Sequence, residues 1–325
     1  MTNEVRAWAA DAPGVPLRAI RQAEPRPGPG KVRIRVAACG LNFADTLMLA
    51  GRYQEQPDPP IIPGMEVCGV VDALGTRVSA LAVGQRVTAY VGHGGLAEAL
   101  CVPVESCIAL PDRIGDVDGA AFQIAYGTTH LALTHRAHLQ PGERLVVTGA
   151  AGGTGLAAVQ IGAQLGAEVI AIARGAAKRA VAQDAGAAHT FDAESADLRE
   201  EIRAIGGVAV GLDTVGAPLW DTLLSAANPE ARLFPLGFAG GRVPLIKANH
   251  LLVKNLTVIG FYWGGYQRFA PQVLTESLQQ VLAWMEAGDL KVPVGARYPF
   301  TEADRALEAL RDGTAAGKIV VTMPA

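Results

Sequence analysis

The sequence predicts an α/β protein in which a doubly wound parallel sheet is joined to a β-rich domain. The parallel sheet is predicted by a strand, a glycine turn, a helix and a second strand over residues 145–173. Buried apolar runs at 208–216, 231–238 and 256–263 continue this pattern. The β-rich domain is predicted by short apolar runs that Pro and Gly turns separate. A chain of 325 residues is long enough for both domains.

The glycine turn lies in VVTGAAGGTGLAAVQIGAQLGA, residues 146–167. Residues 145–167 carry no charged side chain and are long enough to cross a bilayer. Four glycines at 149–155 argue against a membrane span, because they supply positive φ angles and interrupt a helix. A strand at 145–148, a turn, and a helix that ends at Gly166 fit the residues better.

The turn at the start of this helix predicts an anion site. Unpaired backbone N–H groups and the positive end of the helix dipole face outward there. The spacing Ala150-x-Gly152-x-x-Gly155 is the dinucleotide pattern with Ala in its first place. A pyrophosphate is the ligand that this pattern favours, and a glycine turn that serves only packing is the alternative.

The second strand of the unit indicates which dinucleotide binds. It runs into ARGAAKR, and no acidic residue occurs between Glu168 and Asp184. A carboxylate there would hold a ribose hydroxyl, whereas cations suit a ribose 2′-phosphate. We therefore predict NADPH as the cofactor, with Arg174 and Lys178 as the phosphate contacts. A solvated loop is the alternative interpretation of these cations.

Composition and charge exclude several classes of partner. Charged residues make up 18% of the chain, and the 28 Lys and Arg nearly balance the 31 Asp and Glu, for a net charge of −3. No nucleic acid partner is expected. The start MTNEVRAWAADAPG lacks the apolar core of a signal peptide, so we expect a cytoplasmic protein with no membrane association. The four cysteines lack a CxxC pair and are interpreted as reduced thiols.

Four separated motifs show a family resemblance that covers almost the whole chain. They are GLNFADTLMLAGRY (40–53), PGMEVCGVV (63–71), the AAGGTG form of the glycine turn, and AAGKIVV (315–321). Together they resemble the medium-chain dehydrogenase/reductase superfamily, and within it the zinc-independent, zeta-crystallin-like quinone oxidoreductase branch. The resemblance implies a GroES-like catalytic domain at 1–120 and 267–325 and a Rossmann NADPH-binding domain at 121–266.

Zinc alcohol dehydrogenases of this superfamily use a Cys in the first motif and a His beside Glu in the second. The corresponding residues here are Asn42 and Met65. Neither an amide nor a thioether replaces a thiolate and an imidazole as a zinc ligand, so no metal is predicted. Without a Lewis acid, the hydride acceptor must already be electrophilic. A quinone or a conjugated enone meets this requirement.

The resemblance also implies site residues. As catalytic residues it implies Asn42, which can bind the cofactor ribose or an acceptor oxygen, and Tyr53, which can donate a hydrogen bond or a proton to a developing oxyanion. The alternatives are a helix cap for Asn42 and a loop aromatic for Tyr53. Structural hydrogen bonds or an Arg pairing are expected for Asp45 and Glu66. The cofactor-binding residues predicted from motif and strand ends are Asn42, Thr128, Gly152, Gly153, Thr154, Gly155, Arg174, Lys178, Thr214, Gly237, Phe238 and Phe261.

The sequence leaves two other functions open. One is reduction of an enoyl thioester of CoA or an acyl carrier protein, for which Arg52, Arg242, Lys247 and Arg268 are candidate phosphate contacts. The other is NADPH binding without significant turnover. Two cofactor contacts of some quinone reductases are missing, since Ala125 and Ala193 stand where a Lys and a Tyr are expected. The apolar run at 256–263 could form a sheet edge that pairs in a homodimer.

Overall fold

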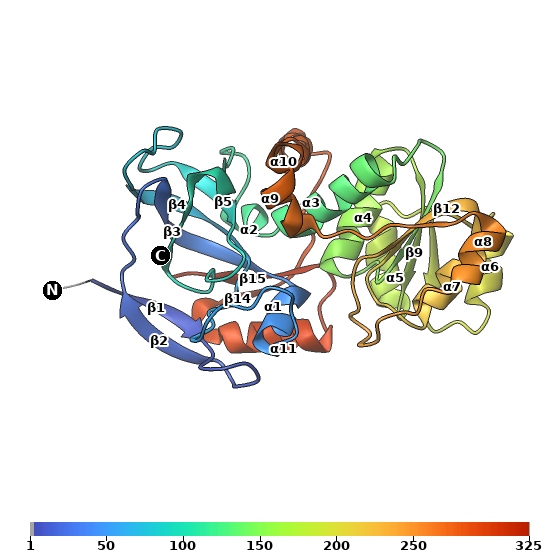
Figure 1. Cartoon of the computed structure of the whole chain (residues 1–325), viewed down its shortest axis with the longest axis horizontal. Coiled ribbons are helices and arrows are strands. Elements are labelled where there is room, and N and C mark those ends of the chain that lie inside the picture. Colours follow the sequence, from blue (N-terminus) through green and yellow to red (C-terminus); the bar gives the residue numbers. More distant parts are fainter. Residues whose placement is uncertain (1–2, 325) are drawn as a thin grey trace. The chain divides into compact units, whose positions relative to one another are not determined.

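A computed structural model describes residues 3–324 and divides them into two compact units (Figure 1). Unit 1 comprises the described residues up to Ile124 and those from Lys291 onward, and unit 2 is Ala125–Leu290. The structure places the second boundary between the units after residue 290, whereas the resemblance implied a boundary near 266. The difference arises because Ser277 and Trp284 contact His130 within unit 2: the Ser277 Oγ lies 2.8 Å from the His130 Nδ1, and the rings of Trp284 and His130 are 5.2 Å apart.

Unit 1 is built around a seven-stranded sheet with the order β14-β15-β3-β4-β5-β7, in which β6 also pairs with β3. A separate antiparallel pair is formed by β1 and β2. The strands are β1 (Glu4–Ala9), β2 (Arg18–Ala23), β3 (Lys31–Leu41), β4 (Glu66–Leu74), β5 (Arg86–Tyr90), β6 (Ala99–Pro103), β7 (Cys107–Ala109), β14 (Val294–Pro299) and β15 (Lys318–Thr322).

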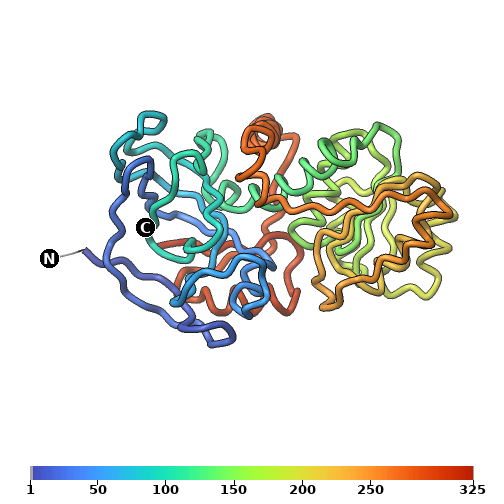
Figure 2. Tube along the Cα trace, in the orientation of Figure 1, coloured from blue at the N-terminus to red at the C-terminus, as the bar shows by residue number. Residues whose placement is uncertain are grey.

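Strand β3 organises this sheet because it pairs with β4, β6 and β15. Its side chains alternate between buried and less buried positions, which is typical of a strand that packs one face on a core. Figure 2 shows the red C-terminal segment beside the blue N-terminal strands, and in the register Ile319 lies opposite Leu41. The helices of this unit are α1 (Phe43–Leu49), α2 (Asp116–Gly119) and α11 (Ala303–Asp312).

Unit 2 contains a parallel six-stranded sheet with the order β10-β9-β8-β11-β12-β13. The strands are β8 (Arg144–Thr148), β9 (Glu168–Ala173), β10 (His189–Asp192), β11 (Val208–Asp213), β12 (Ala227–Pro235) and β13 (Thr257–Val258). Strand order reverses between β8 and β11, which is the switch point of a doubly wound sheet. The predicted α/β fold class is confirmed.

The helices of unit 2 precede, connect and follow its strands (Figure 1). They are α3 (Gln123–Leu131), which begins in unit 1, α4 (Gly153–Gln164), α5 (Ala176–Asp184), α6 (Leu198–Ala204), α7 (Leu219–Ala226), α8 (Ala248–Lys254), α9 (Tyr266–Phe269) and α10 (Pro271–Ala287). Residues 145–167 divide between β8, a turn and α4, as predicted. In the described part of the chain, no helix is both long and apolar enough to cross a membrane.

The last predicted strand is much shorter than expected. The apolar run at 256–263 contributes only Thr257 and Val258 to β13, although β13 does form an edge of the sheet. The amide of Ile259 still donates to the carbonyl of Leu233, over 2.9 Å, but the chain then leaves the sheet. Phe261 packs instead against the rings of Phe234 and Tyr266, so side-chain packing ends the strand that the apolar pattern predicted.

Candidate functional site

The glycine turn of unit 2 joins β8 to α4 with two positions that only glycine fits. Gly149 has a φ of +63°, which L side chains rarely adopt. A Cβ at Gly155 would lie 2.2 Å from the carbonyl oxygen of Gly149, so α4 packs directly on the turn. These are the roles that glycines play in a dinucleotide-binding turn: one permits the bend and another permits close packing of the helix.

The N-terminus of α4 presents the free amides of a first helical turn. Gly152 is the N-cap, and a glycine has no side chain that could cap these amides. The first amide that bonds within the helix is that of Leu156, which donates to the carbonyl of Gly152 over 2.8 Å. The amides of Gly153, Thr154 and Gly155 therefore belong to the first turn, where α-helical N–H groups lack intrahelical acceptors. A Cβ at Gly152 would make only ordinary contact, 3.4 Å from the Gly149 oxygen, so internal packing does not require glycine there.

A buried carboxylate holds the loops at the switch point. Asp213 at the end of β11 accepts hydrogen bonds from the Thr148 hydroxyl and from the amides of Val215 and Gly216. Burial raises the pKa of this carboxyl above its ordinary value, and the hydroxyl and amide donors oppose the shift. The Thr214 hydroxyl donates to the carbonyl of Thr148 over 2.9 Å, so the ends of β8 and β11 are tied together.

The other predicted cofactor residues of unit 2 lie in neighbouring loops. The loop after β12 contacts the loop after β11, because the amide of Gly237 donates to the carbonyl of Asp213 and that of Ala239 to the carbonyl of Thr214. Phe238 lies between these two residues in the same loop. Phe261 packs on Phe234 of β12. Thr128 lies on α3 and is half-buried.

Two cations and an ion pair lie where β9 leads into α5. Arg174 follows the last residue of β9 and is exposed, and Lys178 is in the first turn of α5. Arg179 forms an ion pair with Asp192, the last residue of β10. The prediction of a 2′-phosphate site rested on the absence of acids along the β9–α5 segment. The structure brings the Asp192 carboxylate to that segment from the next strand.

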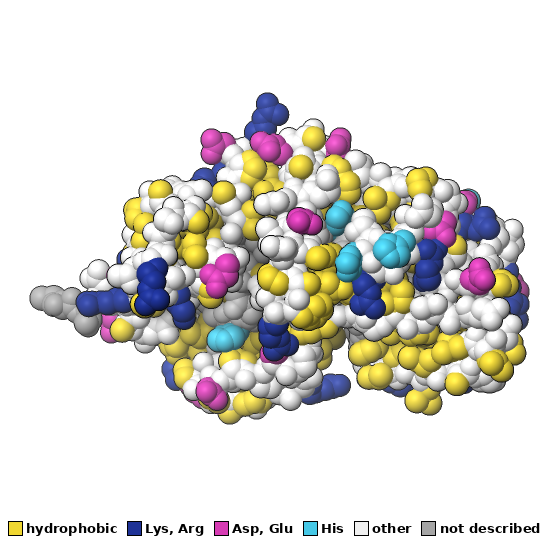
Figure 3. Space-filling model, turned by 45° about the horizontal axis from the view of Figure 1, so that its top comes forward, with side chains coloured by type: hydrophobic (Ala, Val, Ile, Leu, Met, Phe, Trp, Pro, Cys, Tyr) yellow, Lys and Arg dark blue, Asp and Glu magenta, His cyan; other side chains and the backbone are white. Residues whose placement is uncertain are grey.

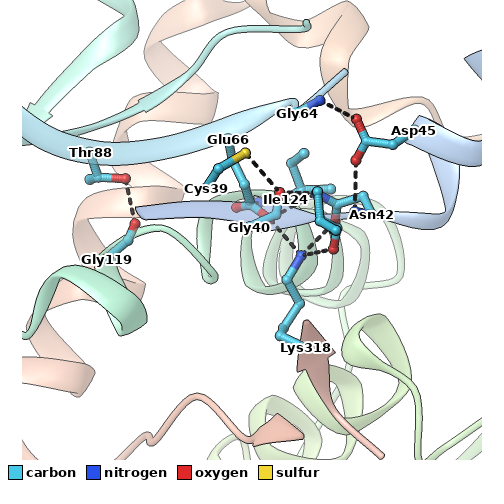
Figure 4. Close-up of polar contacts among 11 residues, drawn as sticks. Cys39, Gly40, Asn42, Asp45, Gly64, Glu66, Thr88, Gly119, Ile124 and Lys318 are labelled. Atoms are coloured by element: carbon cyan, nitrogen blue, oxygen red, sulfur yellow. Dashed lines mark hydrogen bonds and ion pairs between the residues drawn. The ribbon is translucent and has the colours of Figure 1, made fainter. Parts of the chain in front are cut away.

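In unit 1 the residue Asn42 belongs to a buried polar cluster that also contains Glu66 and Lys318 (Figure 4). The Lys318 ammonium donates to the Asn42 Oδ1 over 2.7 Å, to the Glu66 Oε1 over 2.6 Å and to the carbonyl of Leu41 over 2.9 Å. The Asn42 Nδ2 donates to the same Glu66 oxygen over 2.9 Å. Both ends of the Asn42 amide are therefore held, which fixes the orientation of the side chain.

The second oxygen of Glu66 reaches the start of α3. The Glu66 Oε2 accepts the amide of Ile124 over 3.1 Å, while Gln123 donates to the Thr88 hydroxyl over 2.9 Å. The Thr88 hydroxyl in turn donates to the carbonyl of Gly119 over 2.6 Å (Figure 4). Glu66 thus joins three segments of unit 1 that are distant in the sequence. The expected structural role of Glu66 agrees with these contacts, with a Lys rather than an Arg as partner.

Asp45 holds the loop before β4 against the start of α1. The Asp45 Oδ1 accepts the amide of Gly64 over 2.7 Å, and the Oδ2 accepts the amide of Asn42 over 2.8 Å. Burial raises the pKa of Asp45 to about 6, and the two amide donors oppose this shift. Asp45 therefore makes the structural hydrogen bonds that the sequence analysis expected.

Tyr53, the second predicted catalytic residue, lies in the loop after α1. It is half-buried, and its carbonyl accepts a hydrogen bond from Gln56 over 3.0 Å. Asn42, by contrast, is the N-cap residue of α1. The two predicted catalytic residues thus flank the same short helix of unit 1.

Comparisons with known proteins place these features in a family. Residues 28–112 match the alcohol dehydrogenase GroES-like domain, and residues 153–286 match the zinc-binding dehydrogenase family. The chain is 36% identical over 300 residues to a quinone oxidoreductase-like protein 2 homolog of Nematostella vectensis. The matched residues make up 90% of this chain and 82% of that protein. The chain belongs to the quinone oxidoreductase branch of the medium-chain dehydrogenase/reductase superfamily. It is an oxidoreductase, and the GroES-like and Rossmann domain types are confirmed.

Solved structures of this superfamily have the same fold over nearly the full chain. A quinone oxidoreductase from Thermus thermophilus, whose structures include a complex with NADPH, is 36% identical, with a TM-score of 0.87 over 98% of this chain and 99% of that one. The CurK enoyl reductase is 27% identical, with a TM-score of 0.88 over 99% of both chains.

The name of the second matched family raises the question of zinc. The residues of this chain do not fit a zinc ion, because Asn42 and Met65 offer an amide and a thioether instead of thiolate and imidazole. The neighbouring Glu66 already binds the Lys318 ammonium. Among residues 3–324 no group of three or more His, Cys, Asp or Glu side chains could hold a metal ion.

Two residues of the site regions were missed by the sequence analysis. Lys318 stands in the AAGKIVV motif, yet only the pairing of β15 with β3 brings it next to Asn42. Asp192 lies in FDAESADL, directly before Ala193, the position where a Tyr is expected. Lys318 is a charged residue at the start of the apolar strand KIVVT, which was an available signal, whereas the strand HTFD and the acidic residues after it gave no such signal for Asp192.

Proposed function

We propose that this oxidoreductase uses NADPH and transfers a hydride to a quinone or a conjugated enone without zinc. The observation that carries the proposal is the turn at 149–155, where glycine is required for the bend and for helix packing and leads into the first-turn amides of α4. The NADPH complex of the Thermus thermophilus relative supports the choice of cofactor.

The proposed cofactor residues have distinct tasks. The amides of Gly153, Thr154 and Gly155 would bind the pyrophosphate, and Arg174 and Lys178 would bind the 2′-phosphate. The remaining proposed contacts, which follow strand ends or lie on α3, are Asn42, Thr128, Gly152, Thr214, Gly237, Phe238 and Phe261. Bound NADPH would supply the hydride.

The protein residues of unit 1 would orient the reaction rather than activate the acceptor through a metal. Lys318 and Glu66 fix the Asn42 amide, so Asn42 would present a constant geometry to the cofactor ribose or to an acceptor oxygen. Tyr53 would donate a hydrogen bond or a proton to the oxygen that gains negative charge. The acceptor is a small electrophilic molecule, because the mechanism supplies no Lewis acid.

Tyr53→Phe tests the proposed proton donor. We expect kcat to fall by roughly 100-fold, the lower limit of what a positioned acid contributes, while the Kd for NADPH stays nearly constant. Steady-state kinetics and fluorescence titration measure the two quantities. Tyr298→Phe, on β14, is the matched control. An unchanged kcat would remove Tyr53 from the mechanism.

The acceptor class is tested by NADPH oxidation with a small quinone and an enoyl-CoA side by side. We expect kcat/KM for the quinone to exceed kcat/KM for the thioester.

The CurK enoyl reductase supports the thioester as the second candidate acceptor. The candidate phosphate contacts of that reaction are divided between the units: Arg52 follows α1, whereas Arg242, Lys247 and Arg268 belong to unit 2. A preference for enoyl-CoA would move the assignment to enoyl reduction, and tight NADPH binding with no acceptor reduced would favour a binding protein.

We also propose a homodimer that pairs through the β13 edge of unit 2. The segment just before β13 exposes large apolar side chains, namely Val243, Leu245, Ile246, Leu252 and Val253, each at least 46% exposed. Figure 3 shows apolar side chains gathered on unit 2 at the lower right of the view. Exposed apolar side chains beside a sheet edge favour association.

Light scattering tests this dimer. We expect twice the chain mass of 33.8 kDa for the wild-type protein. Leu252→Asp with Val253→Asp should shift the protein to the monomer mass, because charges would enter an apolar interface. Val83→Asp changes an exposed apolar residue of unit 1 and should leave the mass unchanged. A monomeric wild-type protein would contradict the proposal.

A further inference from the structure

The end of β10 places a carboxylate beside the proposed 2′-phosphate contacts. Asp192, the last residue of β10, is the register partner of Ala173, the last residue of β9. Arg174 follows Ala173 directly, and Lys178 lies one helical turn further on. The carboxylate therefore originates from the strand adjacent to the segment that carries both cations.

Several donors hold this carboxylate in place. The Asp192 Oδ2 pairs with the Arg179 Nη1, and the Oδ1 accepts the amide of Glu194 over 3.1 Å. These contacts hold the pKa of Asp192 below its ordinary value: the Glu194 amide contributes most, and Arg179 and the amide of Gly175 also lower it. Gly175 is the N-cap of α5 and lies in the turn between Arg174 and Lys178.

This ion pair changes the charge that a phosphate would meet. Asp192 pairs with Arg179, which is one of the three cations at 174–179. A guanidinium that binds a carboxylate has fewer N–H groups left for a phosphate. The ion pair with Asp192 therefore weakens the contribution of Arg179 to binding of a 2′-phosphate.

We propose that Asp192 is a specificity-determining residue that limits the preference for NADPH over NADH by holding Arg179 in an ion pair beside the 2′-phosphate site. The inference rests on the proposed function, because it presupposes that the end of β9 binds the adenosine ribose. It adds a residue from the next strand to the phosphate contacts expected at Arg174 and Lys178. Arg179 would favour binding of the 2′-phosphate only when it is not paired with Asp192. The two neighbouring charges therefore have opposite effects on the preference for NADPH.

Binding titrations of NADPH and NADH test this with four proteins: wild type, Asp192→Asn, Arg179→Gln and the double variant. The measured quantity is the ratio of the NADH Kd to the NADPH Kd. Asparagine keeps an oxygen that can accept the Glu194 amide but removes the charge, and Asp192→Ser serves as a second variant. We expect Asp192→Asn to raise the ratio about fivefold, the size of one exposed ion pair. The gain should disappear in the double variant, because it depends on Arg179.

Asp184→Asn removes the same charge from the other end of α5 and should leave the ratio unchanged. An unchanged or lower ratio in both Asp192 variants overturns the inference, and so does a gain that persists without Arg179. If the wild-type protein binds neither coenzyme, the proposed function fails and this inference fails with it. If it binds NADPH and the Asp192 variants behave as wild type, the inference alone is wrong.

Discussion

Replacing Lys318 with methionine is expected to lower the free energy of unfolding by about 3–5 kcal/mol, the usual cost of removing one partner from a buried ion pair. Lys318 and Glu66 are 3% and 0% exposed in their side chains, and 2.6 Å separates the ammonium from the carboxylate. Methionine fills a similar volume but leaves Glu66 with only the Asn42 amide group and the Ile124 amide as donors among the described residues. Urea unfolding measures the change.

Two further variants show whether the cost comes from the uncompensated charge. Lys318→Met combined with Glu66→Gln should recover part of the lost stability, because the buried carboxylate is then neutral. Lys31→Met removes a lysine from the exposed start of β3 and should change stability by no more than about 0.5 kcal/mol. A loss below about 1 kcal/mol for Lys318→Met would contradict the structural importance of the cluster.

Replacing Arg174 and Lys178 together with glutamine is expected to raise the Kd for NADPH by roughly 10- to 100-fold. The estimate corresponds to losing about one charge-assisted hydrogen bond to the phosphate. NADH lacks the 2′-phosphate, so its Kd should change little and serves as an internal control. Fluorescence titration of both coenzymes measures the effect. Equal changes for NADPH and NADH would argue against a 2′-phosphate site at the end of β9.

The sequence was sufficient for features that depend on local spacing. The turn at 149–155 was predicted from its glycines, of which Gly149 is required by its positive φ and Gly155 by close packing, and the structure places it between β8 and α4. The replacement of zinc ligands by Asn42 and Met65 was also readable from two motifs. The bound cofactor and the roles of individual residues stay predictions.

Features that depend on long-range pairing could not be predicted in the same way. Lys318 and Glu66 are 252 positions apart and meet only because β15 and β4 both pair with β3. Asp192 reaches the β9–α5 turn through the register of β10. The apolar run at 256–263 predicted a full strand, but the aromatic packing of Phe261 takes the chain away from the sheet after β13.

The most direct test of the central claim is a single turnover in chelator-treated protein whose metal content has been measured. NADPH is bound first, a small quinone is then added in a stopped-flow instrument, and the nicotinamide absorbance is followed. The account predicts that bound NADPH is oxidised at a rate at least equal to the steady-state kcat, with no dependence on added zinc. Bound NADPH that stays reduced until zinc is restored would contradict it.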